Sequence, residues 1–266
     1  MRILDELEYF YKVYILGTIN KLLVKNFGSK YPWVKQPVDS RDYILTLPTV
    51  ALPSTVDLRN KMPSVYDQGD LGSCTANAIG AAFEYLEAVK TMPSRLFIYY
   101  NERSLEGTVS TDAGAIIRDG IKVVVKNGVC PESLWPYNVA QFAVKPPQKC
   151  YDQAIKHVVV KYYSVQQNLT ALKTALASNL PIVFGVSVYE SFEQVTDGNI
   201  PMPKPSEKCL GGHAILICGY CDKTQRFIFR NSWGTSWGQA GYGTLPYAYV
   251  TNPNLASDFW VIQSET

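Results

Sequence analysis

Apolar residues follow a helical spacing in the first half of the chain. The stretch 74–86 is rich in alanine and places apolar side chains three and four positions apart, which predicts an amphipathic helix that begins near Cys74. Two further helices are predicted over 94–101 and 114–128. The second should end at Gly128, because glycine readily adopts the backbone conformation that terminates a helix.

Beyond about residue 155 the pattern changes to short runs of β-branched and aromatic residues, which predict strands. One helix, over 168–178, is expected to interrupt them. Helices followed by strands indicate an α+β fold with segregated lobes, here a helical lobe over about 60–155 and a β lobe over about 156–266. The predicted strands cover 158–163, 182–188, 214–220 and 226–230.

The first 52 residues differ in character from the rest. Residues 1–30 include apolar side chains at helical spacing, and prolines punctuate 31–53, which favours extended chain there. Aromatic side chains such as Tyr31 and Trp33 are costly to leave in water. We therefore expect this extension to pack on the rest of the protein rather than to form a free tail.

Composition and charge narrow the function classes. A chain of 266 residues that is 47% hydrophobic can form one large domain or two lobes around a core. Its 25 basic and 23 acidic residues nearly balance, which gives no sign of nucleic-acid or anionic-membrane binding. We see no membrane-spanning run and no signal peptide, expect a monomer, and leave the compartment open, export included.

The clearest chemical signal surrounds Cys74. Small residues precede it, and a helix is predicted to begin at or beside it. The unpaired N–H groups and the dipole of a helix N-terminus favour the thiolate, which is the form of cysteine that attacks a carbonyl carbon. A buried structural cysteine is the alternative, and the turn of small residues before the helix argues against it.

A thiolate nucleophile needs a base, and the chain contains two histidines. His213 follows Gly211 and Gly212, whose small size would let a substrate approach. His157 precedes a run of valines without glycine beside it, so we expect it to have no catalytic role. The sequence therefore favours His213 as the partner of the cysteine.

Several motifs in order resemble those of the papain family of cysteine proteases. In that family a histidine and then an asparagine follow the nucleophile after about 130–150 residues. Here His213 follows Cys74 after 139 residues, and Asn231 follows His213 after another 18. The resemblance covers about residues 53–263 and is strongest to bacterial members. The matching stretches are Val56-Asp57-Leu58-Arg59, Gln68, Asn127-Gly128-Val129, Trp135-Pro136-Tyr137, Gly212-His213-Ala214, Asn231-Ser232-Trp233-Gly234 and Trp237-Gly238.

The resemblance implies a papain-like two-lobed fold, with an N-terminal helical lobe and a C-terminal antiparallel β-barrel-like lobe that meet at the active-site cleft. It implies a cysteine endopeptidase that hydrolyses peptide or protein substrates through an acyl-enzyme on Cys74. His213 would act as general base and then acid, and Asn231 would orient its imidazole. Gln68 would stabilise the oxyanion, and Trp233 would shield the Asn–His contact from water.

The same resemblance implies which residues contact the substrate. Small glycines beside the histidine suggest a roomy pocket with an apolar preference. For the segment around Asp112 an alternative stays open, in which this side chain caps a helix N-terminus. The implied substrate-binding residues are Asp112, Ala113, Gly114, Gly211, Gly212 and Trp233, with further lining from about 184–186 and 257–259.

The chain departs from the family pattern at two positions. Leu71 stands where relatives often have a cysteine, so that disulfide is absent, and Thr75 replaces an aromatic residue. Cys130 and Cys150 could pair with each other, or every thiol could be reduced, and the sequence does not choose between these states.

A zinc site is a weak alternative use of the cysteines. Cys209, His213, Cys218 and Cys221 have spacings that resemble metal ligands. Positions 213 and 218 differ by an odd number, so on one strand their side chains would point to opposite faces. We expect no metal and no cofactor.

The resemblance also suggests a division of the chain. Residues 1–52 would be an N-terminal extension, either a prosegment that lies over the cleft as an intramolecular inhibitor or an integral strap that is never removed. Residues 53–266 would be the peptidase domain. Two other functions stay open on the same fold, a non-proteolytic acyl transferase or amidase and an inactive peptide-binding homologue.

Overall fold

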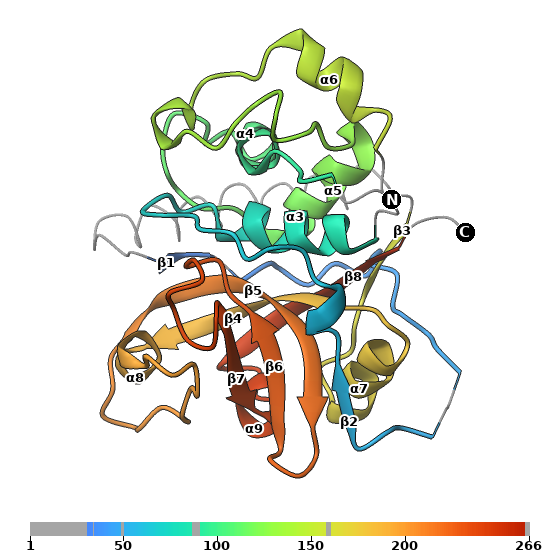
Figure 1. Ribbon diagram of the computed structural model, residues 1–266, viewed down its shortest axis with the longest axis vertical. Coiled ribbons are helices and arrows are strands. Elements are labelled where there is room, and N and C mark those ends of the chain that lie inside the picture. The colour runs from blue at the N-terminus through green and yellow to red at the C-terminus, as the bar shows by residue number, and fades with distance from the viewer. Residues whose placement is uncertain (1–30, 34, 49–50, 87–90, 158–160, 264–266) are drawn as a thin grey trace.

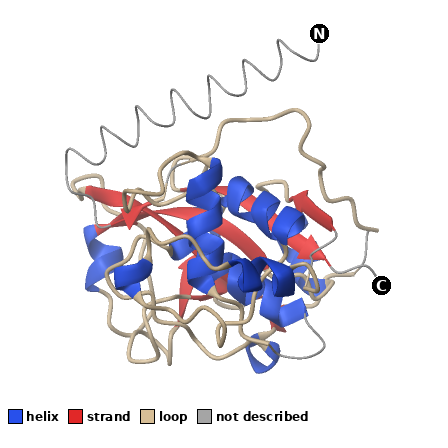
Figure 2. Cartoon of the chain, turned by 90° about the horizontal axis from the view of Figure 1, so that it is seen from above, coloured by secondary structure: helices blue, strands red, loops and turns tan. Residues whose placement is uncertain are grey.

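The computed structural model describes residues 31–33, 35–48, 51–86, 91–157 and 161–263. A layer of helices packs against a twisted sheet (Figure 1), and Figure 2 shows from above how the helices overlie the strands. The predicted helix near the N-terminus and the first three residues of the strand predicted over 158–163 lie outside the described residues. The helical layer contains α3 (Cys74–Leu86), α4 (Arg95–Leu105), α5 (Ile117–Asn127) and α6 (Gln148–Ala154).

The sheet follows the strand order β3-β8-β4-β5-β6-β7, and every neighbouring pair in this order is antiparallel. Two short strands join β5 separately, β2 in antiparallel and β1 in parallel orientation. The α+β arrangement is confirmed, and within the described residues the sheet stays open, so the expectation of a barrel-like β lobe is corrected. The strands are β1 (Tyr31–Pro32), β2 (Thr55–Asp57), β3 (Lys161–Ser164), β4 (Ile182–Tyr189), β5 (Cys209–Cys221), β6 (Arg226–Arg230), β7 (Tyr242–Pro246) and β8 (Ala256–Gln263).

Most of the predicted elements form, with shifted ends. The hydroxyl of Ser94 caps α4 by accepting from the N–H of Phe97, and Asn168 caps α7 (Leu169–Ala177) in the same way. Helix α5 begins three residues later than predicted, because residues 112–114 contact the turn before Cys74 and the strap instead of forming a helical turn. Hydrophobic spacing did not indicate α6, the short α8 (Glu190–Gln194) and α9 (Tyr247–Val250), or strands β2, β7 and β8.

Two large apolar cores lie on the two faces of the sheet. One fills the space between the sheet and helices α7 and α9, and the other lies between the sheet and helices α3, α4 and α5. Both faces of β4 and β5 are thus covered, which explains why these strands read as nearly continuous apolar runs. Cys74 belongs to the second core, so its helix begins directly against the strands.

The cysteines carry free thiols in this structure. Cys130 and Cys150 are both fully buried and belong to one small apolar cluster with Phe97 and Ala154. No helix among the described residues has the length and apolar character needed to cross a bilayer.

Residues 31–33 and 35–48, which we call the strap, run in extended form from the seam between the lobes along the body (Figure 1). The N–H of Gln36 donates to Asp258 over 2.8 Å, and Arg118 forms an ion pair of 2.5 Å with Asp42. The N–H of Leu45 donates to the carbonyl of Ser164. The strap is therefore held along its length and does not rest on a single contact.

The glycine that ends α5 offers a test of the fold. At Gly128 φ is +70°, and an added Cβ would overlap the carbonyl of Ala154. We expect Gly128→Ala to lower the free energy of unfolding by about 3 kcal/mol, since strain and a backbone clash add. Gly107→Ala is the matched control, because φ there is +69° with open space around the Cβ position, and about 1 kcal/mol is expected. If urea unfolding shows that both variants lose the same free energy of unfolding, the clash at Gly128 is contradicted.

Candidate active site

Cys74 and His213 meet at the seam between the helical lobe and the sheet. Cys74 is the first residue of α3, and the backbone N–H groups of Ala214 and Thr75 lie close enough to its sulfur to favour the thiolate and lower the pKa of the thiol. Ala214 directly follows His213 on β5, so the sulfur lies beside the strand that carries the histidine. The side chains of Cys74 and His213 are both buried, and the contact between α3 and β5 joins residues far apart in sequence.

Asn231 and Trp233 hold the imidazole in place. The Nε2 atom of His213 is 2.8 Å from the Oδ1 of Asn231, which also accepts from the N–H of Ser232. An amide oxygen only accepts, so Nε2 carries the proton and Nδ1 of the neutral ring is left able to take one. The ring of Trp233 stacks on the imidazole at 4.9 Å between centroids, which limits its rotation.

Gln68 is fixed from both sides of the seam. Its Nε2 donates to the carbonyl of Leu71 over 2.9 Å, and its Oε1 accepts from the hydroxyl of Ser232 over 2.5 Å. Its backbone N–H also donates to the carbonyl of Ser232. One proton of the side-chain amide remains for another acceptor. Sequence reasoning did not single out Ser232, although it stands between two of the motif residues.

The segment of Asp112, Ala113 and Gly114 is irregular chain and does not cap a helix. Helix α5 begins after Ile116 without a side-chain cap, so the alternative in which Asp112 caps it is wrong. Asp112 instead accepts from the N–H of Gly72 over 3.0 Å and from the hydroxyl of Tyr99. It thereby holds the turn of small residues that precedes Cys74.

The strap covers this turn. An added Cβ at Gly114 would lie 2.6 Å from the carbonyl oxygen of Pro32, and one at Gly72 would lie 2.6 Å from the ring of Pro32. Only glycine permits so close an approach of another backbone. The chain of the strap therefore passes over the residues for which the sequence predicted contact with a substrate.

Trp33 fills the space beside Gly212. Its N–H donates to the carbonyl of Gly212 over 3.0 Å, and a Cβ at either Gly212 or Gly185 would overlap its indole ring. Gly211 pairs with Tyr31 in the short parallel ladder between β1 and β5. The glycines thus leave room for a large aromatic side chain, and Gly185 falls within the stretch 184–186 that the sequence suggested as further lining.

Tyr31 packs near the histidine. Its ring centroid is 5.8 Å from that of Trp233 and 6.2 Å from that of His213, and its hydroxyl donates to Glu193 over 2.9 Å. Three consecutive residues of the strap therefore contact the site: Tyr31 lies near His213, Pro32 lies against Gly72 and Gly114, and Trp33 lies against Gly185 and Gly212.

Burial controls the protonation of the central pair. Desolvation raises the pKa of the Cys74 thiol to about 12, although the N–H of Ala214 partly opposes this. Desolvation lowers the pKa of His213 to about 4, and the hydrogen bond to Asn231 opposes this in part. With the strap in place, burial favours the neutral form of the Cys74 thiol and the neutral form of the His213 imidazole.

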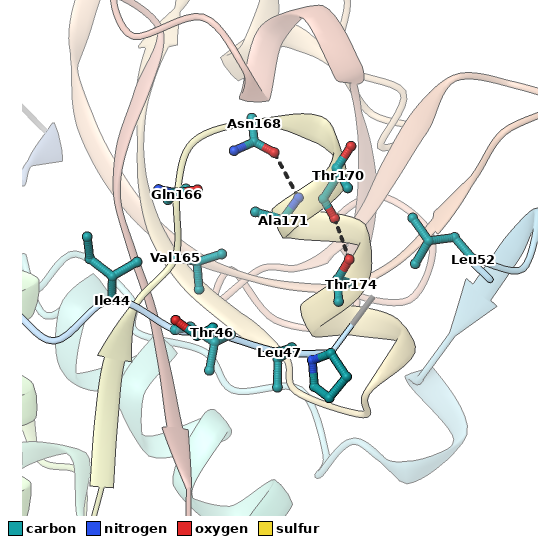
Figure 3. A pocket seen from close by; sticks show the side chains of 12 residues that line it. Ile44, Thr46, Leu47, Leu52, Val165, Gln166, Asn168, Thr170, Ala171 and Thr174 are labelled. Carbon is teal, nitrogen blue, oxygen red and sulfur yellow. Dashed lines mark hydrogen bonds between the residues drawn. The ribbon is translucent and has the colours of Figure 1, made fainter. Parts of the chain in front are cut away.

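A separate pocket lies where the strap passes the N-terminal turn of α7 (Figure 3). Asn168 and Thr174 face it from the helix, and both make hydrogen bonds within that helix. This pocket shares no residue with the site at the seam. Its lining includes Ile44, Leu47, Leu52, Val165, Asn168 and Thr174.

Comparisons with known proteins agree with this geometry. A family model described as papain family cysteine protease matches residues 52–258. An uncharacterized peptidase C1-like protein, L477 of Acanthamoeba polyphaga mimivirus, is 42% identical, over 91% of this chain and 88% of its own length.

Solved structures show the same similarity. Xylellain, a cysteine protease from Xylella fastidiosa, is 42% identical with a TM-score of 0.84, and the match covers 90% of this chain and 97% of xylellain. Digestive procathepsin L 3 of Tenebrio molitor larval midgut has a TM-score of 0.70 at 18% identity, over 90% of this chain and 79% of its own. The second match concerns the fold alone.

The buried state of the thiol gives a test. We expect Trp33→Ala to admit water, lower the pKa of Cys74, and raise its alkylation by iodoacetamide at pH 7 by about 10-fold, because the thiolate is the reacting form. The rate–pH profile should move to lower pH, as followed by mass spectrometry of the Cys74 peptide. Val38→Ala is the control, since Val38 belongs to the strap but is 96% exposed. Identical profiles for the two variants would contradict the role of Trp33.

Proposed function

The chain belongs to the papain family of cysteine proteases and is a peptidase that hydrolyses peptide bonds, and from this we propose that Cys74 is its nucleophile and His213 its general base. The observation that carries the proposal is the position of the Cys74 sulfur against the N–H of Ala214, next to the imidazole. Asn231 holds Nε2 of the imidazole, so Nδ1 is the nitrogen able to accept the thiol proton.

In the proposed reaction Nδ1 of His213 takes the proton from the Cys74 sulfur, and the thiolate attacks the carbonyl carbon of the scissile bond. The oxyanion accepts from the backbone N–H of Cys74 and from the remaining amide proton of Gln68. The imidazolium then gives its proton to the leaving amine, which leaves an acyl-enzyme. Water, deprotonated by His213, attacks the thioester and regenerates the thiol.

We also propose that residues 31–33 inhibit the enzyme by occupying the cleft. Pro32 lies on Gly72 and Gly114, and the N–H of Trp33 already uses the carbonyl of Gly212. These are backbone surfaces that a substrate would need. The family model begins at residue 52, which supports treating 1–52 as an extension to the peptidase domain. Gln36 and Asp42 are anchored separately, to Asp258 and Arg118, so opening requires displacement of 31–33 and not loss of the whole strap.

Trp33 also indicates the kind of side chain that a substrate would place in the pocket it fills. That pocket is bounded by Gly185 and Gly212, and the indole lies against both. Neither glycine has a side chain that limits the size of the occupant. We propose that the enzyme prefers peptides with a large apolar residue at this position, which enters when Trp33 leaves.

The catalytic assignments are tested by turnover of a random peptide pool. We expect Cys74→Ala to abolish cleavage with the fold retained, because the buried side chain becomes only slightly smaller. Gln68→Ala should lower kcat by about 100- to 1000-fold, the usual effect of losing one oxyanion donor. Asn231→Ala should slow turnover without abolishing it. If the parent chain reacts at Cys74 with a thiol-directed epoxide but cuts no peptide, the assignment as a protease is wrong, whereas the assignment of Cys74 as a nucleophile holds.

The inhibitory role of the strap is tested by the same peptide pool. We expect Trp33→Ala in the full chain to raise kcat/KM by about 10-fold or more, since the pocket is vacated and the N-terminal part of the strap is loosened. Val38→Ala, a substitution of an exposed strap residue, should leave the rate unchanged. If Trp33→Ala and the parent turn over peptides at the same rate, residues 31–33 do not inhibit.

A further inference from the structure

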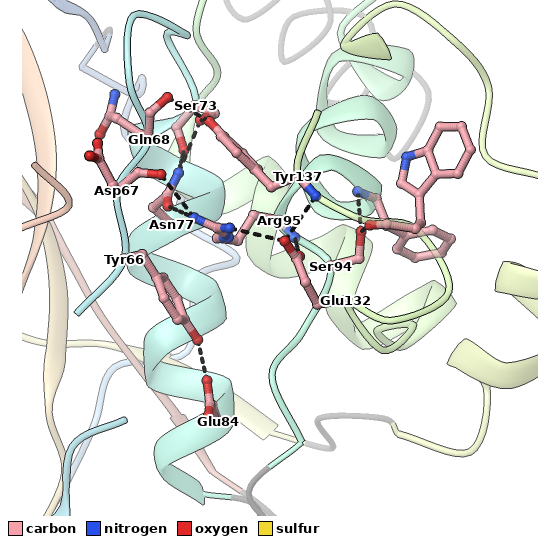
Figure 4. Close-up of polar contacts among 12 residues, drawn as sticks. Tyr66, Asp67, Gln68, Ser73, Asn77, Glu84, Ser94, Arg95, Glu132 and Tyr137 are labelled. Atoms are coloured by element: carbon pink, nitrogen blue, oxygen red, sulfur yellow. Dashed lines mark hydrogen bonds and ion pairs between the residues drawn. The ribbon is translucent and has the colours of Figure 1, made fainter. Parts of the chain in front are cut away.

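A polar cluster joins the segment that carries Gln68 to the beginning of α3 (Figure 4). Several of its members are buried, and they come from separate parts of the helical lobe. The mechanism above uses only Gln68 among them. We call the following residues the loop cluster: Asp67, Gln68, Ser73, Asn77, Arg95, Glu132 and Tyr137.

Tyr137 lies at the centre of the loop cluster. Its hydroxyl donates to the backbone carbonyl of Gln68 over 2.9 Å and lies 2.6 Å from the hydroxyl of Ser73. Since its own proton is used on Gln68, the hydroxyl of Ser73 is the donor to Tyr137, and Asn77 in turn donates to Ser73 over 3.0 Å. These hydrogen bonds form a directed chain from α3 to Gln68, in which each bond polarises the next.

This chain links the two proposed oxyanion donors. Gln68 provides its side-chain amide, and Ser73 is bonded to Cys74, whose backbone N–H is the other donor. The residues between them include Gly69, with φ of +57°, and Gly72, whose N–H is held by Asp112. A glycine-containing loop has many conformations available, so the distance between the donors needs an external brace. Tyr137 provides one across the mouth of the loop.

Arg95 fixes Tyr137 in turn. Its guanidinium lies 4.0 Å from the centroid of the Tyr137 ring, donates to the carbonyl of Asp67 over 3.1 Å, and forms an ion pair of 3.0 Å with Glu132. Glu132 also accepts from the backbone N–H of Tyr137 over 2.9 Å. The phenol is thus held by its ring, its backbone and its hydroxyl, and has little freedom to swing away from the loop.

We propose that Tyr137 is a positioning residue of the oxyanion site, whose hydroxyl sets the separation between the amide of Gln68 and the N–H of Cys74. This inference rests on the proposed function of those two groups. Tyr137 acts through them, because its hydroxyl is occupied by Gln68 and Ser73. Ser232 holds the side chain of Gln68 from the β lobe, and Tyr137 holds its backbone from the helical lobe.

The test compares reactions that form an oxyanion with one that does not. In the full chain, Tyr137→Phe keeps the ring beside Arg95 and removes only the hydroxyl. We expect kcat for peptide hydrolysis to fall about 10-fold with little change in KM, since a displaced donor loses part of its effect. Binding of a peptide aldehyde should weaken by a similar factor, because its carbonyl adds the Cys74 sulfur and leaves its oxygen in the same site. Alkylation of Cys74 by iodoacetamide forms no oxyanion and should keep its rate.

Two further variants separate positioning from general damage. Tyr220→Phe also removes a hydroxyl that donates to a backbone carbonyl, that of Pro53 over 2.7 Å, and should change none of these quantities. Ser73→Ala breaks the same link at its other end and should give the same pattern as Tyr137→Phe. Because both act through one link, the double variant should lose little more than either single variant.

The outcomes separate this inference from the proposed function. Aldehyde affinity is measured by calorimetry, so it needs no turnover. An active parent whose kcat and aldehyde affinity survive Tyr137→Phe would overturn the positioning role alone, as would a variant that loses alkylation to the same extent as turnover. A parent that neither hydrolyses peptides nor binds the aldehyde would overturn the oxyanion site and this inference together.

Discussion

The structure depends on the packing of one helix end against one strand. The N-terminus of α3 packs against β5, so that the sulfur of Cys74 lies beside the backbone N–H of Ala214, the residue next to His213. A thiol and an imidazole can exchange a proton only at such close range, and neither element could bring the two together alone. The two apolar cores on the faces of the sheet hold this contact, since α3 cannot move without exposing the side chains it buries.

The burial that fixes the positions of Cys74 and His213 also disfavours their charged forms. Water stabilises a thiolate and an imidazolium, and the closed site offers few substitutes apart from the N–H of Ala214 and the oxygen of Asn231. The strap adds to this exclusion of water, because Tyr31 packs near the histidine and Trp33 fills the space over the neighbouring glycines. The protonation of Cys74 and His213 and the access of substrate to them therefore both depend on residues 31–33. A change that displaces Trp33 also makes the charged forms of the pair less costly.

Polar groups on both sides of the seam meet at Gln68. Ser232, which follows Asn231 in the chain, forms hydrogen bonds with the side chain and the backbone of Gln68 from the β lobe. The loop cluster forms hydrogen bonds with Gln68 from the helical lobe. The Asn231-Ser232 motif therefore orients His213 through Asn231 and Gln68 through Ser232. Buried polar groups with their partners in place resist movement, because a lost partner leaves an unsatisfied group in a dry environment.

The sequence by itself determined much of this protein. Helical spacing located α3, β-branched runs located β4 and β6, and the order of Cys74, His213 and Asn231 indicated the family, because these signals are local or are fixed by the chemistry itself. It missed β7 and β8, whose residues become strands only beside their neighbours in the sheet. It left Asp112 between a helix cap and a loop that contacts the substrate, since both uses suit the same residue types. Only the tertiary structure decided that Trp33 fills the space over Gly185 and Gly212, and that Tyr137 reaches Gln68, because contacts between distant segments depend on how the lobes pack and leave no periodic trace in the chain.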